Sequence, residues 1–212
     1  MSKGIIVLGA SGHAKVCIEI LSAMSFVVDW CIADREGVTS CHQVPVLVGD
    51  HHLLRLRSEG YSRIFVAIGS NEIRCKLSEM VLRLGYTLVN AISPQAMVSP
   101  SAQVGQGVAI MAGVVINADS VISDFSIINT GTCIDHDCHV GIASHIAPTS
   151  GLAGGVVIGN GAFLGIGTKV IPGVKIGEYA VVGAGAVVVR DVPAGAKAIG
   201  VPARCLVRSN YE

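Results

Sequence analysis

The densest cluster of reactive side chains in this chain is the run Cys133-Ile134-Asp135-His136-Asp137-Cys138-His139. His136 lies between two carboxylates, and a carboxylate beside an imidazole fixes its tautomer and stabilises its protonated form. The pattern indicates a general base, with either Asp135 or Asp137 orienting the ring. The alternative interpretation is an exposed histidine on a protein wall with no chemical role.

A strict six-residue period surrounds this cluster. Every sixth residue from Val98 to Val188 is Val, Ile or Leu, and the residue two positions earlier is small or β-branched. Neither an α-helix nor a simple strand has this period, whereas the stacked coils of a parallel β-helix do. With three hexapeptides to a coil, the repeat predicts about five coils stacked roughly 4.8 Å apart.

The same period predicts which side chains share a face. Cys138, two residues before the inward Val140, should point into the coil, whereas His136 and His139 should point outward. We therefore do not expect these groups to share one tetrahedral site, and we expect no metal. His145 follows His136 by half a coil, so the two should lie on different faces of one subunit and cooperate only across a subunit interface.

Residues 1 to about 92 follow a different pattern, in which short apolar runs alternate with helical segments. The expected strands cover residues 4–8, 27–32, 63–67 and 87–89, and the expected helices cover 14–24, 51–58 and 71–84. This alternation predicts a small Rossmann-like α/β domain, too small for two mononucleotide halves and a nicotinamide cofactor. We place the domain boundary between residues 92 and 93. Residues 93–212 then form the β-helix, capped at one end by the α/β domain, and its tail from residue 191 folds back as a loop or short element.

Two strand-to-helix turns of this domain could bind an anion. The first, Gly9-Ala10-Ser11-Gly12-His13, aims free N–H groups at its ligand, although Gly-x-x-Gly also occurs in tight connections that bind nothing. The second, Ala67-Ile68-Gly69-Ser70-Asn71, should lie at the same sheet edge, where Asp34 ends another strand and could contact a ribose. Arg74 either neutralises a phosphate there or is a solvated surface residue.

Composition excludes several classes of function. Fifteen Lys and Arg balance fifteen Asp and Glu, so there is no electrostatic argument for nucleic acid or an anionic membrane as partner. The seven cysteines include no CxxC pair and fit free thiols in a reducing cytosol. The apolar run at residues 5–8 is too short for a secretory signal, so we expect a cytoplasmic protein.

Taken together, these features resemble one family of acyltransferases. The hexapeptide repeat is similar to that of the left-handed β-helix acyltransferases. The N-terminal turn, the Asp135-His136-Asp137 triplet and the run Gly200-Val201-Pro202-Ala203 resemble bacterial nucleotide-sugar N-acetyltransferases of the bacillosamine and perosamine pathways. Sialic acid O-acetyltransferases share this layout. The resemblance implies acetyl-CoA as co-substrate, a nucleotide sugar held by the N-terminal domain, and a homotrimer with active sites between neighbouring β-helices.

The resemblance also implies roles for individual residues. His136 matches the catalytic base and Asp137 its acidic partner, although the bacillosamine-type enzymes carry Glu at that position. The residues that match the substrate-binding positions are Ser11, Gly12, His13, Asp34, Arg35, Gly69, Ser70 and Asn71. The residues that match positions near coenzyme A and its thioester are His145, Gly167, Gly185, Pro202 and Arg204.

The expected reaction is transfer of acetyl from acetyl-CoA to the amino group of a nucleotide-linked sugar of the UDP-4-amino-sugar type. The amine attacks the thioester directly, with His136 as general base. One alternative is O-acetylation of a sialic acid, because the same histidine could deprotonate a hydroxyl. The other is a non-catalytic β-helix scaffold, although an inert wall would not need a histidine between two carboxylates.

Overall fold

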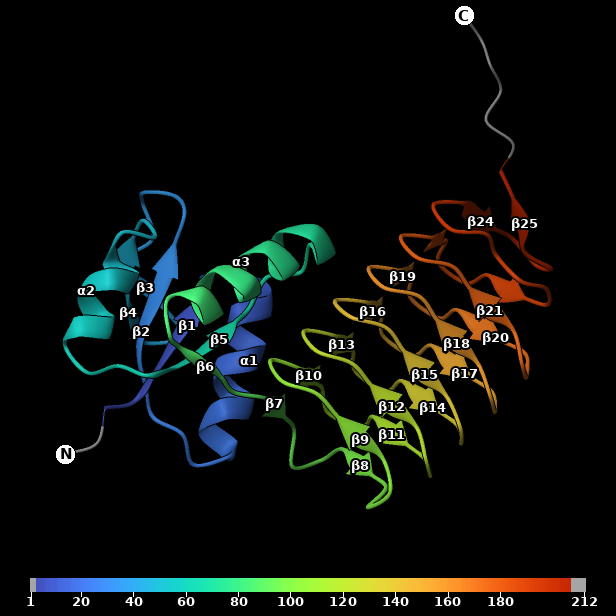
Figure 1. Ribbon diagram of the computed structural model, residues 1–212, viewed down its shortest axis with the longest axis horizontal. Coiled ribbons are helices and arrows are strands. Elements are labelled where there is room, and N and C mark those ends of the chain that lie inside the picture. The colour runs from blue at the N-terminus through green and yellow to red at the C-terminus, as the bar shows by residue number, and fades with distance from the viewer. Residues whose placement is uncertain (1–2, 207–212) are drawn as a thin grey trace, which may run out of the picture.

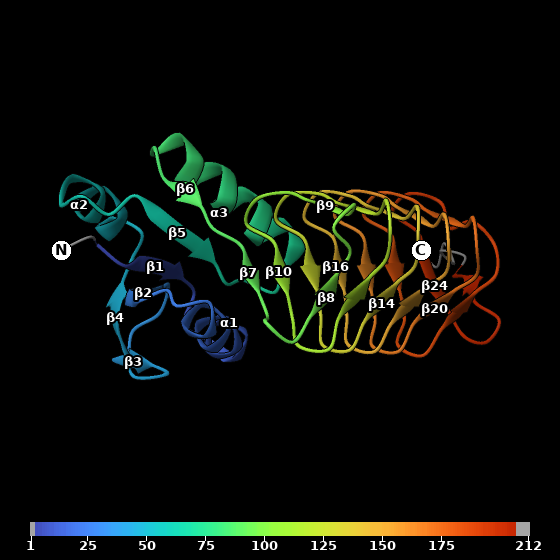
Figure 2. The same cartoon turned by 90° about the horizontal axis from the view of Figure 1, so that it is seen from below.

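The computed structural model describes residues 3–206 and contains an α/β domain followed by a left-handed parallel β-helix (Figures 1 and 2). This confirms the fold class predicted from the sequence. The two parts share a continuous apolar core, which runs from helix α1 into the coils of the β-helix. No helix within residues 3–206 has the length and apolarity to cross a membrane.

The N-terminal domain is built on one six-stranded sheet with the strand order β3-β4-β2-β1-β5-β6. Its strands are β1 (Ile5–Leu8), β2 (Val28–Ala33), β3 (Ser40–Cys41), β4 (Val44–Val48), β5 (Arg63–Val66) and β6 (Thr87–Leu88). Its helices are α1 (Gly12–Ala23), α2 (His52–Ser58) and α3 (Asn71–Arg83). The direction of winding reverses at β1, and open α/β sheets bind ligands at the carboxyl edge beside such a reversal.

Strands β3 and β4 are absent from the sequence prediction. The run Val44–Val48 contains Pro45, which cannot donate a hydrogen bond and therefore argues against an inner strand. In the structure β4 pairs in parallel with β2, and Pro45 lies opposite Ser40 of the two-residue edge strand β3. The omitted strand matters for the site because the chain leaves it at Gly49-Asp50, beside the expected binding edge.

The β-helix consists of two-residue strands arranged in three sheets. The first sheet contains β7 (Ala91–Ile92), β10 (Ala109–Ile110), β13 (Ile127–Ile128), β16 (His145–Ile146), β19 (Phe163–Leu164), β22 (Val181–Val182), β24 (Lys197–Ile199) and β25 (Arg204–Cys205). The second contains β8 (Met97–Val98), β11 (Val115–Ile116), β14 (Cys133–Ile134), β17 (Gly151–Leu152), β20 (Lys169–Val170) and β23 (Val187–Val188). The third contains β9 (Gln103–Val104), β12 (Val121–Ile122), β15 (His139–Val140), β18 (Val157–Ile158) and β21 (Lys175–Ile176).

Each coil takes eighteen residues, as the repeat predicts. Ile128 pairs with Ile110 in the coil before it and with Ile146 in the coil after it, and all three are fully buried. Strand β7 pairs with β10, so the ladder starts at Ala91, two residues before the predicted boundary. The small residues beside the aliphatic stack include buried hydroxyls that donate to carbonyls of the next coil, for example Ser126 Oγ to Gly141 O at 2.9 Å.

The corners of the coils explain the abundance of glycine. Every sixth residue from Gly107 to Gly185 has a φ between +54° and +73°, a region that glycine enters without steric cost. Six of these corners carry side chains instead: Asp119, Phe125, Asp137, Ala143, Thr149 and Tyr179. Among these six, Asp137 is the neighbour of His136, and Phe125 and Ala143 face the N-terminal domain.

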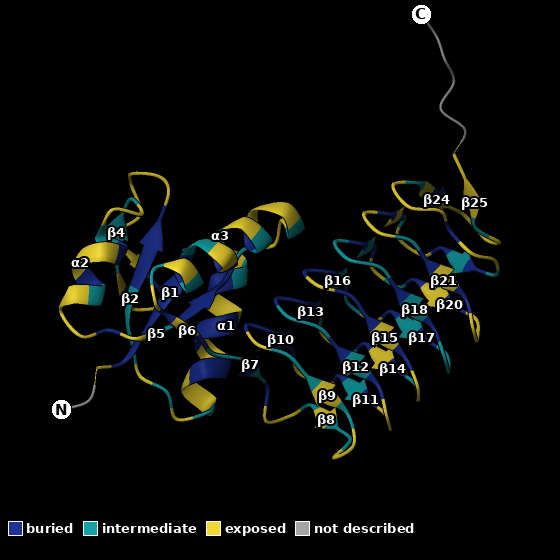
Figure 3. Cartoon of the chain, viewed as in Figure 1, coloured by how far each residue is buried: buried dark blue, intermediate teal, exposed yellow. Residues whose placement is uncertain are grey.

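The two ends of the coil stack differ. At the N-terminal end α1 packs against β7, and its buried Cys17, Ile18 and Leu21 join the core of the first coils (Figure 2). A covered edge does not pair with other chains, which limits aggregation. At the other end β24 continues one of the three sheets in parallel, and β25 folds back on it in antiparallel orientation as an exposed edge strand (Figure 3). Residues 207–212 of the expected tail lie outside the described residues.

Candidate active site

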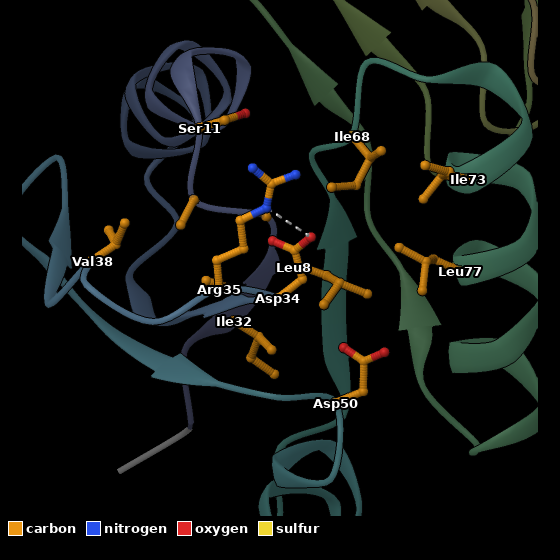
Figure 4. Close-up of a pocket in the computed structure, with 13 residues that line it drawn as sticks. Leu8, Ser11, Ile32, Asp34, Arg35, Val38, Asp50, Ile68, Ile73 and Leu77 are labelled. Atoms are coloured by element: carbon orange, nitrogen blue, oxygen red, sulfur yellow. Dashed lines mark ion pairs between the residues drawn. The ribbon is translucent and has the colours of Figure 1, made fainter.

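A cavity of about 560 Å³ lies at the carboxyl edge of the N-terminal sheet (Figure 4). It is lined by Leu8, Gly9, Ala10, Ser11, Ile32, Ala33, Asp34, Arg35, Val38, Asp50, Ile68, Ile73 and Leu77. These residues come from the ends of β1, β2, β4 and β5 and from one side of α3. Apolar walls with a few polar groups are typical of a site for an organic ligand of nucleotide size.

Three charged side chains face this cavity. Asp34 and Arg35 follow β2, are both 87 % exposed, and approach each other at 3.8 Å. Asp50 follows β4 and points into the cavity from the opposite side to Ser11 (Figure 4). The structure therefore places Asp34 and Arg35 where the sequence analysis expected them and adds a second carboxylate that it did not include.

The first turn divides its side chains between two environments. Ser11 lines the cavity and makes no side-chain cap to α1, and open space surrounds Gly12. His13 instead lies within 3.6 Å of Cys17 Sγ, on the side of α1 that packs on the β-helix. Burial, assisted by the charge of Arg74, lowers the pKa of His13 to about 4, so this imidazole is neutral at physiological pH.

The second turn is tied to the β-helix. Asn71 Nδ2 donates to the carbonyls of Gly161 and Ala162, at 3.0 and 3.1 Å. Asn71 Oδ1 accepts from Arg74 Nη2 at 2.9 Å. The side chain of Asn71 is therefore engaged between the domains, and the groups that this turn offers to a ligand are those of Gly69 and Ser70.

The sequence suggested that Arg74 either neutralises a phosphate at the sheet edge or is a solvated surface residue, and the structure places it in neither setting. It is 1 % exposed and lies in the seam between α3 and the coil corners, outside the cavity. Its guanidinium donates to the carbonyls of Phe125 and Ala143, at 2.6 and 2.9 Å. The arginine is thus neither a solvated surface residue nor a residue that lines the cavity.

His136 lies at the outward corner between β14 and β15. Its Nδ1 is 2.7 Å from Asp137 Oδ2, whereas Asp135 Oδ1 accepts from Asn117 Nδ2 at 3.0 Å and from the His136 backbone N–H at 2.8 Å. The hydrogen bond that His136 donates to Asp137, with the charge of Asp135 as a second cause, raises the pKa of His136. Of the two carboxylates, Asp137 contacts the ring and Asp135 holds the turn.

Gly154, one coil above His136, leaves room for the imidazole. A Cβ at this position would lie 2.6 Å from Cε1 and 2.7 Å from Nε2 of the ring. The backbone of Gly154 does not have a left-handed φ, so the ring alone excludes a side chain here. The glycine therefore fixes where the imidazole can lie.

His145 occupies a different environment, on β16 in the sheet that faces α3. Asn129 Oδ1 accepts the N–H of Thr130 at 2.8 Å, so its amide nitrogen faces His145 Nε2 at 3.1 Å. Nε2 is then the acceptor and Nδ1 carries the proton; within residues 3–206 the buried Nδ1 has no hydrogen-bond partner. Burial, followed by the charges of Arg74 and His13, lowers the pKa of His145 to about 4.

The residues expected near coenzyme A lie further along the β-helix. Gly167 and Gly185 are corners of successive coils in one column, with open space beside Gly185. Pro202 and the exposed Arg204 lie in the terminal hairpin that covers the last coil. Cys138 points into the coil, where its Sγ donates to Ala153 O at 3.2 Å, and residues 3–206 contain no cluster suited to a metal ion.

Within one chain the cavity and His136 are separated. The cavity is lined by residues of the N-terminal domain, whereas His136 lies at a corner of the β-helix between the second and third sheets. The sequence analysis did not name Asp50 or Gly154, and it misjudged the surroundings of Arg74. Asp50 follows an unpredicted strand, Gly154 is one of many glycines in the repeat, and Arg74 owes its setting to carbonyls distant in sequence. Only Gly154 had a sequence signal, its eighteen-residue spacing from His136.

Comparison with known proteins agrees with this architecture. A model of the PglD N-terminal domain matches residues 4–81, and one of the bacterial transferase hexapeptide matches residues 155–190. The crystal structure of PerB from Caulobacter crescentus, in complex with CoA and GDP-perosamine, is 52 % identical with a TM-score of 0.93 and covers 97 % of this chain and 98 % of its own. Structures of two variants of that enzyme, with a histidine replaced by asparagine or alanine, are similar at the same identity. The acetyltransferase domain of PglB from Neisseria gonorrhoeae, in complex with acetyl coenzyme A, is 36 % identical with a TM-score of 0.91 and covers 97 % and 100 %.

A PglD-type domain on a left-handed β-helix, with a histidine–carboxylate pair at a coil corner, defines an acyltransferase enzyme. The identity and coverage show the narrower group: the chain belongs to the family of acetyl-CoA-dependent nucleotide-sugar N-acetyltransferases. This confirms the resemblance predicted from the sequence.

Proposed function

We propose that this enzyme acetylates the amino group of a GDP-linked amino sugar, rather than the UDP-linked sugar that the sequence suggested. The relative with 52 % identity is described with GDP-perosamine. The cavity also offers two carboxylates, Asp34 and Asp50. Guanine carries an N1–H and an exocyclic amine that can donate to such an acceptor.

The catalytic part of the proposal depends on one observation, the 2.7 Å contact between His136 Nδ1 and Asp137 Oδ2 at an exposed corner. His136 Nε2 takes a proton as the sugar amine attacks the thioester carbonyl carbon. The C–S bond then breaks, and the coenzyme A thiolate leaves as the thiol with that proton. Such a base supplies roughly 10²–10⁴-fold. His145 or a backbone N–H stabilises the oxyanion, a contribution of about 3 kcal/mol.

We propose that the working unit is a homotrimer. The separation of the cavity from the corner that carries His136 supports this, because a neighbouring copy can bring the two parts together. In this arrangement coenzyme A follows the column of Gly167 and Gly185 toward Pro202 and Arg204. The cytoplasmic location stays a prediction.

A second candidate function is O-acetylation of a sialic acid, since His136 could deprotonate a hydroxyl as well as an amine. Similarity over nearly the whole chain to an enzyme described as a perosamine N-acetyltransferase favours the amine. The scaffold alternative loses its support, because the chain belongs to a family of enzymes.

A thiol-release assay with acetyl-CoA tests the proposal. The acceptors are GDP-perosamine, a UDP-4-amino sugar, CMP-sialic acid and free sialic acid. We expect the fastest release with GDP-perosamine. Faster release with the UDP sugar would reverse the choice of nucleotide, and release only with a sialic acid would overturn N-acetylation.

A further inference from the structure

All three nitrogens of the buried Arg74 guanidinium donate hydrogen bonds, and none of the acceptors is a carboxylate. It makes six hydrogen bonds of 2.6–3.3 Å, to the carbonyls of Ile68, Gly69, Phe125, Ala143 and Ser144 and to Asn71 Oδ1. Burial lowers its pKa to about 10, so it remains a cation at neutral pH. A buried charge is costly unless it is fully hydrogen-bonded, as this one is.

The acceptors come from two parts of the molecule. Phe125 and Ala143 are left-handed corners of successive coils, whose carbonyls are directed at α3. Ile68 and Gly69 belong to the turn between β5 and α3. Arg74 therefore fixes that turn against the rigid wall of the β-helix.

The direction of the carbonyls determines the direction of the amides. Ile68 O and Gly69 O point at Arg74 Nη1, at 3.0 and 3.1 Å. Both following peptide bonds are trans, and in a planar trans peptide the C=O and N–H point in opposite directions. The N–H groups of Gly69 and Ser70 therefore point away from Arg74, and within residues 3–206 neither has an acceptor.

Gly69 and Ser70 are both exposed. A Cβ on Gly69 would have no neighbour within 4 Å, and Ile68 at the start of the turn lines the cavity. Ser70 precedes α3 with an extended backbone, and its hydroxyl makes no side-chain cap to the first turn of the helix. Free N–H groups at the start of a helix are suited to an anionic oxygen.

We propose that Arg74 is a positioning residue for the nucleotide-sugar substrate: by holding the carbonyls of Ile68 and Gly69, it aims the amides of Gly69 and Ser70 at the diphosphate without touching it. This inference rests on the proposed function, which supplies the diphosphate. According to this proposal, a positive charge at position 74 is not enough for substrate binding. The side chain must also hold the two carbonyls so that the amides of Gly69 and Ser70 point at the diphosphate.

The first test separates charge from geometry. R74K keeps the cation but cannot reach all six acceptors, and R74M removes both. We expect each to weaken GDP binding, measured by calorimetry without acetyl-CoA, by about tenfold or more. The KM for the nucleotide sugar should rise similarly, while the KM for acetyl-CoA stays within about twofold. R74K with unchanged GDP affinity would overturn the inference, as would equal changes in both KM values.

The second test leaves the seam intact, in case the Arg74 variants do not fold. Ser70 has a φ of −67°, which suits proline, so S70P removes one amide hydrogen without straining the backbone. S70A loses the same hydroxyl but keeps the amide. We expect S70P to bind GDP about tenfold more weakly than S70A, and equal affinities would contradict the proposal.

The two proposals fail in different ways. If the wild-type protein binds GDP or UDP but acetylates no amino sugar, the proposed function is wrong and the role of Arg74 is still measured by binding. If neither nucleotide binds the wild-type protein, the inference about Arg74 is overturned, whatever acceptor the enzyme uses.

Discussion

Two regions of this molecule give the imidazole ring opposite properties. At the exposed corner, Asp137 and Asp135 raise the pKa of His136. In the seam between the domains, burial and the charge of Arg74 lower the pKa of His13 and His145 to about 4. One fold therefore prepares one histidine to accept a proton and keeps two others neutral.

The comparison shows how two positioning strategies differ. The corner fixes its histidine by local means, since Asp137 is the next residue and Gly154 lies one coil above. The seam fixes its groups by long-range contacts, in which Arg74 joins α3 to carbonyls about fifty to seventy residues away in sequence. Removing a local contact should affect the reaction, whereas removing a seam contact should affect stability and substrate affinity.

The largest effect should follow from removing the base itself. H136A is expected to lower kcat by about 10³-fold, within the range of general-base catalysis. Steady-state thiol release with the best acceptor measures this. His139, exposed on β15 with no polar partner within residues 3–206, provides the control, and H139A should keep near-normal activity. Comparable losses of kcat in H136A and H139A would contradict the assignment of His136 as the general base.

The seam should make the protein sensitive to acid. Because His13 and His145 have native pKa values of about 4 against 6.5 for a free histidine, the unfolded chain binds protons between these values that the native state does not. Their neutral forms thus keep full stability above pH 6.5, and the free energy of unfolding falls as the pH drops toward 4, by about 3 kcal/mol for each histidine. Denaturant unfolding of H13N and H145N should show a flatter acid arm than that of the wild-type protein. An acid arm unaltered by both seam variants would be incompatible with neutral buried histidines.

Asp137 can be changed without disturbing the corner, since asparagine tolerates its φ of +57°. D137N should lower kcat by about 30-fold, because the ring loses its orienting carboxylate. It should also move the acidic limb of the kcat/KM profile to lower pH, since the raised pKa of His136 depends first on this contact. If D135N moves that limb and D137N does not, then Asp135 is the carboxylate that orients His136.

The smallest effect should come from Gly154. Its backbone accepts alanine, but the new Cβ would displace the imidazole of His136. We expect G154A to keep its melting temperature and to lose about fivefold in kcat, because small displacements of a reacting group are costly. In the same coil, Gly151 meets only the flexible side chain of Lys169, so G151A is a matched control. Equal rates for the two variants would show that the ring is not held by this glycine.

The sequence predicts the β-helix better than the α/β domain for a physical reason. Within the repeat, the neighbours of a residue lie eighteen positions away, so the inward stack and the outward His136 follow from counting. The N-terminal sheet has no such rule, and Pro45 concealed a strand and the carboxylate that follows it. The burial of Arg74 could not be predicted from the sequence. It has no acidic partner among the described residues and is stabilised by backbone carbonyls of Phe125 and Ala143, whose directions depend on the folded coils and not on the residues near Arg74 in sequence.

Because each coil contains eighteen residues, the β-helix also limits how such an enzyme can change in length. Each additional coil would advance the stack by roughly 4.8 Å. A coil inserted between Phe125 and Asp137 would move His136 relative to the domain anchored at Phe125, and the seam would no longer match its corners. A coil added after Val188 would leave the seam and His136 in register, but it would displace the terminal hairpin and with it Pro202 and Arg204. Length variation at the far end of the stack should therefore preserve the seam and the base and change only the contacts that the terminal hairpin makes.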